Sequence, residues 1–351
     1  MSSKINLQTC EYARKSSIFQ DNQLISIYFK KIISKNILFM MILVLLLVGV
    51  SERIVNLMVA NDSYVLDRNK SIFRILREPE NSVDIIVLGD SLGMTSISPM
   101  AWWGDYGMTG YVCGQTGQRM QEAFHMLQAA YETQSPKLVI LETNMVFRCK
   151  NLSSEVKDCL GEIGYRYIPI FQGHDIWKSI LSEKQYPAEN YKGFAFRCET
   201  VPYEQGEYMQ KNDQKEEISK IVSFYLEKIR KLCEKNGTKL LLVSTPSPIN
   251  CNYARHNSIE AYAREKGLDF VDLNLKTEEI GINWKTDSLD NGDHLNYSGA
   301  DKVTRYLGNY LTQNYTFPDH RGKKTYRTWD KEYKIYEQKA VREMKVIKKA
   351  G

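Results

Sequence analysis

Strand-like and helix-like patterns alternate along most of this chain, and that alternation limits the possible fold more than any other feature. Residues 83–88 are dominated by aliphatic and β-branched side chains and end at a Gly-Asp-Ser turn, which predicts a buried strand. The pattern recurs, with further strands predicted at residues 111–113, 137–141, 239–243 and 268–273 and helices at 118–133, 216–236 and from about residue 300. Such alternation is typical of a parallel sheet with helices on both faces, so residues 80–318 are expected to form an α/β domain.

Two segments depart from this alternation. Residues 145–212 are rich in Tyr, Gly and Lys and hold only short helical patterns, so we expect an insertion over the ligand-binding edge of the sheet. In residues 319–351, apolar side chains recur at spacings of three and four opposite a basic face, which predicts an amphipathic helix. This helix either packs back on the domain or contacts an anionic polymer, a membrane surface or a partner.

A run near the N-terminus, residues 36–51, carries no charge and is apolar throughout residues 37–50. A membrane span usually needs about 20 apolar residues, and apolar residues on both sides extend this run, so we predict one transmembrane helix over residues 36–58. A buried core helix is the alternative that the length allows. A cleaved signal peptide fits less well, because a long leading region precedes the run and no small-residue cleavage site is evident.

The charges beside this run predict its orientation. Residues 1–36 carry six basic side chains and residues 52–70 carry three, so the excess of positive charge places residues 1–35 in the cytoplasm. The domain that follows residue 60 would then lie outside the cell membrane, where cell-envelope polymers are its expected partners.

Composition excludes other classes of function. With 47 basic and 42 acidic residues, the net charge of +5 is too small to predict nucleic-acid binding. The seven cysteines show no Cys-x-x-Cys spacing, which argues against a metal cluster or a redox motif and leaves disulfide pairing open. No metal or organic cofactor is expected.

Polar residues and glycines follow the predicted strands where each strand ends. Asp90 and Ser91 follow the first strand, Gly117 lies in the turn after the second, and Asn144 follows the third. Because the carboxyl ends of parallel strands meet at one edge of the sheet, Ser91 can serve there as a nucleophile, with backbone and amide N–H groups around an oxyanion. Taken singly, these residues are as readily a helix cap, a turn glycine and a strand-ending cap.

A histidine, His294, lies in the loop after the last predicted strand, close to Asp290 and Asp293. At that edge it is placed to act as the general base for Ser91, with an aspartate orienting the imidazole ring. Of the other histidines, His174 in the insertion is a candidate for substrate contact. The remaining three, His125, His256 and His320, are expected to be structural or solvated.

These four blocks resemble those of the SGNH/GDSL hydrolase superfamily, which carries a serine, a glycine, an asparagine and a histidine in this chain order. Gly89-Asp90-Ser91-Leu92 resembles the first block, Gly117 the second, Asn144 the third, and His294-Leu-Asn296 the fourth. The resemblance covers residues 83 to about 313. It implies a three-layer, flavodoxin-like fold, catalytic Ser91 and His294, and an oxyanion hole formed by Ser91, Gly117 and Asn144.

The chain also departs from the family pattern. The family aspartate usually stands three residues before the histidine, where this chain has Asn291. We favour Asp290 as the replacement, with a one-residue bulge in the loop, and Asp293 remains open. The third block retains only Asn144 of the usual Gly-x-Asn-Asp.

The membrane segment and the His-Leu-Asn ending look similar to a cell-envelope branch of the superfamily, related to alginate O-acetylation and teichoic-acid D-alanylation proteins. That resemblance implies a membrane-anchored serine esterase or O-acyltransferase acting on acyl groups, acetyl foremost, of an envelope polysaccharide through an acyl-enzyme. A membrane-bound acyl exporter is a further expected partner. Besides Asp90 and His174, the candidates for substrate contact are three tryptophans that could stack on sugars or pack in the core, Trp102, Trp103 and Trp284. A non-catalytic glycan-binding or envelope-assembly protein is the alternative, supported by the shifted aspartate.

Overall fold

A five-stranded parallel sheet forms the centre of the molecule. The computed structural model describes residues 3–61, 63, 65, 67–148, 152–167, 178, 181 and 190–350. Its strands are β1 (Ile85–Gly89), β2 (Gly110–Gly114), β3 (Leu138–Glu142), β4 (Lys239–Ser244) and β5 (Asp269–Asp272). They lie in the order β2-β1-β3-β4-β5, and each neighbouring pair is parallel. This is the strand order of flavodoxin-like doubly wound folds, so the predicted α/β architecture is confirmed.

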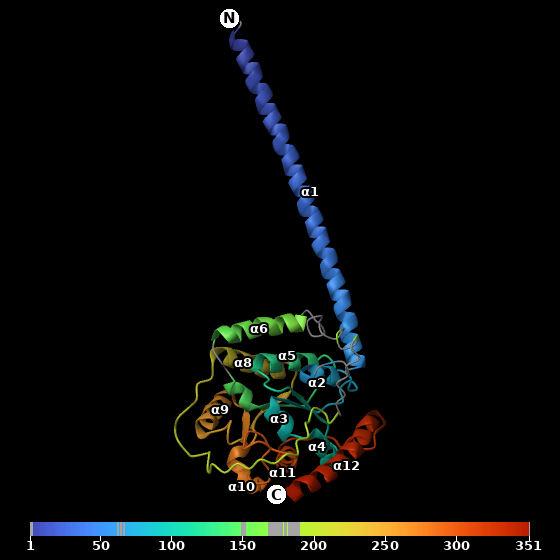
Figure 1. Cartoon of the computed structure of the whole chain (residues 1–351), viewed down its shortest axis with the longest axis vertical. Coiled ribbons are helices and arrows are strands. Elements are labelled where there is room, and N and C mark those ends of the chain that lie inside the picture. The colour runs from blue at the N-terminus through green and yellow to red at the C-terminus, as the bar shows by residue number, and fades with distance from the viewer. Residues whose placement is uncertain are drawn as a thin grey trace.

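Helices cover both faces of the sheet, which is why β1, β2 and β3 are buried along their whole length. One face packs against α2 (Asp67–Ile75), α5 (Met120–Ala130), α8 (Lys220–Lys235) and α9 (Tyr253–Lys266). The other packs against α3 (Ser91–Ser96), α4 (Pro99–Tyr106) and α11 (Tyr297–Asn314). Figure 1 shows the two layers, with α5 and α8 on one side and α4 and α11 on the other. The predicted helices at 118–133 and 216–236 are each a few residues shorter in the structure.

The alternating faces of one strand show how the sequence builds these layers. Ile85 and Val87 contact the apolar cluster that includes Val303 of α11. Ile86 and Leu88 point the other way, into the cluster that includes α5 and α8. Since successive strand residues face opposite sides, a strand covered on both sides must be apolar throughout, as residues 85–88 are.

The N-terminal helix α1 (Ser3–Ala60) extends away from the globular part (Figure 1). Its segment Lys30–Ala60 is long and apolar enough to cross a membrane, by length and composition. The alternative of a buried core helix is wrong, because the side chains of residues 30–50 are all exposed. The end of α1 does pack on the domain, where Met58 joins Val65 and Phe73 in a small buried cluster.

The segment predicted as an insertion, residues 145–212, contains α6 (Leu152–Tyr167), which lies outside α5, and most of an irregular stretch that runs from residue 190 to 219. Part of that stretch runs beside the loop that carries His294. Val201 N–H donates to the carbonyl of Ser288, and Tyr297 N–H donates to the carbonyl of Arg197. His174 lies outside the described residues.

The C-terminal helix α12 (Arg327–Ala350) packs back on the domain, as the first of the two interpretations of its sequence predicts. Trp329 is fully buried and its ring lies 5.4 Å from that of Trp103. The hydroxyl of Ser98 donates a hydrogen bond of 2.9 Å to the hydroxyl of Tyr336. Lys192 is buried over the Trp329 ring and pairs with Glu78, which ties this helix to the rest of the fold.

Candidate active site

Ser91 is the first residue of α3 and directly follows the turn that ends β1. Asp90 caps this helix, since its Oδ1 accepts the N–H of Leu92 at 2.9 Å. The turn is tight: a Cβ atom at Gly89 would lie 3.0 Å from the Cα of Gly93. The Ser91 hydroxyl is therefore presented at the carboxyl edge of the sheet, at the N-terminus of a helix.

His294 lies on a short hairpin whose turn explains the displaced aspartate. Asn291 and Gly292 both have left-handed backbone conformations, with φ of 58° and 86°. Two successive positive φ values are typical of a type I′ turn, for which Asn-Gly is a favoured pair. Leu289 N–H donates to the His294 carbonyl at 2.9 Å, which closes the hairpin. The extra residue is taken up in the turn, so Asp290 folds back onto His294.

The structure brings Ser91, His294 and Asp290 together. Nε2 of His294 lies 2.8 Å from Oγ of Ser91, and Nδ1 lies 2.8 Å from Oδ2 of Asp290. Oδ1 of Asp290 also accepts the backbone N–H of His294 at 2.7 Å. With Nδ1–H donated to the carboxylate, the Nε2 lone pair faces the Ser91 hydroxyl, which is the arrangement a general base needs.

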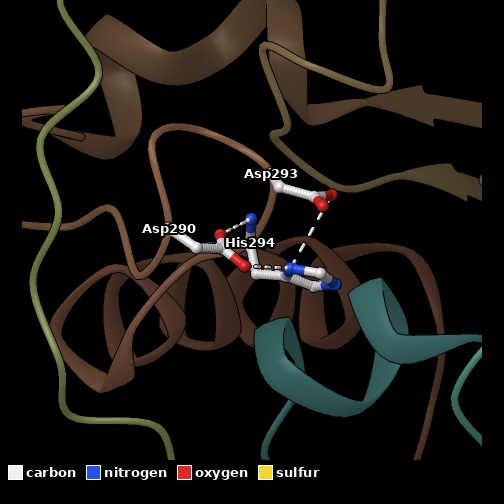
Figure 2. Close-up of side chains that lie close together, drawn as sticks. All are labelled: Asp290, Asp293 and His294. Atoms are coloured by element: carbon white, nitrogen blue, oxygen red, sulfur yellow. Dashed lines mark hydrogen bonds and ion pairs between the residues drawn. The ribbon is translucent and has the colours of Figure 1, made fainter.

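Asp293 lies farther from the imidazole than Asp290. Its Oδ1 is 3.7 Å from Nδ1 of His294 and accepts a hydrogen bond from Asn250. Figure 2 shows both carboxylates directed at the same ring nitrogen. Of the two candidates, Asp290 is the one within hydrogen-bond distance.

The two proposed oxyanion donors follow the strands on either side of β1. Gly117 has a φ of 67° in the turn after β2, and Asn144 lies in the 3₁₀ helix Thr143–Phe147 after β3. Because β2 and β3 are the two neighbours of β1, these turns lie on either side of the one that carries Ser91. Asn144 donates one amide hydrogen to Asp90 at 2.8 Å. An amide has two such hydrogens, so one is left for an oxyanion.

Asp90 is fully buried, which corrects its prediction as a substrate-contacting residue. Its carboxylate accepts from Asn144 and Leu92 and pairs with the guanidinium of Arg148. Sequence reasoning missed Arg148. The only signal was its position four residues after Asn144, in a segment that follows a strand end.

A second buried carboxylate, Glu142, lies beside Asp90. Its oxygens accept from the backbone N–H of Asn144 and the hydroxyl of Thr245. Burial, reinforced by the negative charge of Asp90, raises the pKa of Glu142 well above its usual range. The sequence analysis assigned no role to this glutamate.

Two of the tryptophans predicted as possible sugar contacts lie in the core. Trp102 and Trp103 are 0% and 1% exposed, so neither ring has a face that a sugar could reach, and their prediction as substrate contacts is corrected. Trp102 donates its N–H to the carbonyl of Thr304 in α11. Trp284 is half-buried and packs edge-to-face with Tyr203, near the hairpin of His294.

The other described histidines have structural partners. His256 Nδ1 lies 2.8 Å from Asp272, and this hydrogen bond raises the pKa of the imidazole. His320 Nε2 lies 2.7 Å from Asp84. Burial lowers the pKa of His125.

Asp290, Asp293 and His294 also offer three potential metal ligands whose atoms lie within 4.8 Å of one another. The contact between His294 and Ser91 is what favours a nucleophilic site over a metal site, because a serine hydroxyl is the group that an oriented imidazole activates.

Comparison with known proteins adds only distant structural likenesses. No family model and no curated protein matches the chain. A Bacteroides fragilis protein provisionally assigned as an acylhydrolase is 12% identical, with a TM-score of 0.38, over 70% of this chain and 96% of its own. A GDSL-like lipase from Bacteroides thetaiotaomicron is 13% identical, with a TM-score of 0.33, over 65% and 87%. A two-domain esterase active on acetylated mannans is 15% identical, with a TM-score of 0.37, over 70% and 52%. Values this low assign no family, so we base the proposal below on the site itself.

Proposed function

We propose that this protein is a serine esterase or O-acyltransferase that forms an acyl-enzyme on Ser91. The observation that carries the proposal is the chain of contacts from Ser91 Oγ through the His294 ring to the Asp290 carboxylate, each 2.8 Å long. These residues come from segments about 200 positions apart in the sequence. Such an arrangement of alcohol, imidazole and carboxylate is the one that activates a serine for attack on a carbonyl.

In the first step, Oγ of Ser91 attacks the acyl carbonyl while its proton moves to Nε2 of His294. The N–H groups of Ser91 and Gly117 and the Asn144 amide stabilise the resulting oxyanion. Asp290 stabilises the imidazolium, which then gives its proton to the departing alcohol as the C–O bond breaks. Water or a sugar hydroxyl then attacks the ester left on Ser91, with His294 again accepting the proton. The bond between the acyl carbon and Ser91 Oγ breaks as His294 returns that proton to Oγ, which releases the free acid or the new sugar ester.

The proposed substrate is an acylated, foremost acetylated, cell-envelope polysaccharide. Two features support it: the exposed apolar segment of α1, which we propose crosses the membrane once with residues 1–35 in the cytoplasm, and the resemblance to envelope-modifying proteins. The catalytic domain would lie outside the membrane, and a membrane-bound acyl exporter is a proposed partner. The non-catalytic alternative drew on the shifted aspartate, but Asp290 reaches His294 in the structure, so we do not adopt it.

The test is active-site labelling of the full-length protein in detergent with a fluorophosphonate. We expect wild type to be labelled and Ser91→Ala to remain unlabelled. Ser96→Ala, which removes a buried hydroxyl from the same helix, is the matched control and should be labelled like wild type. An unlabelled wild type, or labelling of Ser91→Ala, would contradict the proposal.

A second measurement separates hydrolysis from transfer. The protein is incubated with an acetylated and a deacetylated envelope polysaccharide and a chromogenic acetyl donor, and free acetate and new sugar esters are quantified together. Because the proposed mechanism uses no metal, EDTA should leave the rate unchanged. Loss of activity on chelation would favour the metal interpretation of Asp290, Asp293 and His294.

A further inference from the structure

Helix α6 (Leu152–Tyr167) presents an apolar stripe outward and turns several charged side chains, Glu155 foremost, toward the protein, the reverse of an ordinary surface helix. Val156, Leu160 and Ile163 are 46%, 65% and 42% exposed. Their spacing of four and three residues places them in one stripe along the helix. A surface helix of a water-soluble domain normally turns such a stripe toward the core.

Ion pairs to the ends of α5 hold α6 in this orientation. Glu155 and Asp158 both pair with Arg119, which caps the start of α5. Arg166, near the other end of α6, pairs with Glu132, just beyond the end of α5. Glu155 is itself 1% exposed. The polar face is therefore engaged with the protein at both ends, and the helix cannot roll over without breaking these pairs.

The position of α6 relates this stripe to α1. Figure 1 shows α6 on the side of the domain from which α1 projects, running across the direction of α1. Within residues 30–60 of α1, residues 30–50 are exposed, Ser51 is buried and Met58 packs on the domain, so contact between α1 and the domain lies beyond the long apolar run. A bilayer crossed by the apolar segment of α1 would have its surface on this side of the domain, roughly parallel to α6.

We propose that the stripe formed by Val156, Leu160 and Ile163 inserts into the interface of the bilayer that α1 crosses, and so fixes the orientation of the domain on the membrane. The inference rests on the proposed membrane anchor. An amphipathic helix lying in the membrane plane buries its apolar face at the boundary between headgroups and acyl chains. Lys157, exposed beside the stripe, would meet anionic headgroups.

The face of the domain that carries α12 makes a matched control. Ile335 is 56% exposed on α12, which lies in the layer opposite α6 (Figure 1). If α1 alone tethered the domain, the faces that carry α6 and α12 would each contact lipid only transiently. Insertion of the stripe would bring residue 160, and not residue 335, into lasting contact with lipid.

The experiment uses the full-length chain reconstituted into phosphatidylcholine and phosphatidylglycerol vesicles, with lipids brominated on the acyl chain near the headgroup. Leu160→Trp, Val156→Trp and Ile335→Trp each place an indole at an exposed position, and wild-type fluorescence is subtracted. We expect strong quenching with a blue-shifted emission for the tryptophans at 156 and 160, and neither for the one at 335. Equal behaviour at positions 160 and 335 would overturn the contact.

Two further outcomes identify the failing step. If alkaline carbonate extracts the wild-type protein from membranes, the proposed membrane anchor is wrong, and the α6 contact that rests on it is wrong too. If the protein resists extraction but the tryptophans at positions 160 and 335 are quenched equally, only the α6 contact is wrong. In native membranes, a benzophenone amino acid at position 160 should cross-link to lipid. A cross-link to a protein instead would assign the stripe to a membrane partner and overturn the lipid contact.

Discussion

The hairpin that carries Asp290 and His294 is local and exposed, whereas the strand ends that carry Ser91 and Asn144 rest on a buried network. Asp290 is 43% exposed and lies four residues from the histidine that it contacts. Asp90 is fully buried and is held by residues 54 and 58 positions away. The contact between Asp290 and His294 is made within one turn, which Val201 and Asn250 hold from outside, while the donors opposite it depend on the packing of the sheet.

The largest effect is expected from a substitution in the hairpin. Asp290→Asn should lower kcat for a chromogenic acetyl ester by roughly 10⁴-fold, because the imidazole loses the carboxylate that sets its tautomer. Asp293→Asn is the matched control and should leave kcat close to wild type, since its carboxylate lies 3.7 Å from Nδ1. Equal losses in the two variants would mean that the aspartates share the role.

The next effect removes a donor from the buried side. Asn144→Ala should lower kcat by roughly 10²–10³-fold with little change in KM, because an oxyanion donor acts in the transition state and not on the bound ester. The control is Thr143→Ala in the same 3₁₀ helix, whose hydroxyl bonds to Ser244. A rise in KM at constant kcat would show instead that Asn144 binds the ground state.

A smaller effect concerns the support for that donor. Arg148→Met leaves the buried Asp90 with one charged partner fewer and should destabilise the fold by about 1.5–3 kcal/mol. Urea unfolding followed by tryptophan fluorescence measures it. Lys231→Met, which breaks a more exposed pair with Glu227, should cost only about 0–1 kcal/mol. Equal losses in the two variants would contradict the view that the strand ends rest on a buried network.

The last expected effect is on the pH dependence of the free energy of unfolding. Burial raises the pKa of Glu142, so the folded state holds a proton that the unfolded chain releases above its ordinary pKa of 4.5. The contribution to stability is therefore fully present below pH 4.5 and declines as the pH rises, by up to about 1.4 kcal/mol per unit until the folded pKa is reached. Glu142→Gln should flatten this decline in urea unfolding between pH 5 and 8. An unchanged slope would show that Glu142 does not hold the proton.

Helices α6 and α12 show what an amphipathic pattern leaves open. In α12 the apolar residues Trp329 and Tyr336 are buried, at 0% and 3% exposure. In α6 the apolar stripe is exposed and the charged face is docked by Arg119 and Glu132. Periodicity predicts that a helix has an apolar and a polar face. In α6, the charged residues at the two ends of α5 decide which face packs against the domain.

The strands could be predicted because their signal is local. Residues 85–88 are apolar at every position, which a strand covered on both faces requires. Once the strands are predicted to be parallel, their carboxyl ends fall on one side of the sheet. This is why the sequence predicts one shared edge for Ser91, Gly117, Asn144 and His294. Arg148 and the burial of Asp90 could not be predicted, because they depend on which side chains from distant segments meet beneath the surface.

By itself, the sequence determined the α/β alternation, the apolar segment of α1 and the residue types available at the sheet edge, since each follows from short-range pattern and strand direction. The tertiary structure alone decided that Asp290 and not Asp293 lies within hydrogen-bond distance of His294, that Trp102 and Trp103 pack in the core, and that α6 turns its apolar face outward. These outcomes depend on turn geometry, burial and pairing between segments far apart in the chain. The free energy of such contacts is gained only when the whole fold is assembled.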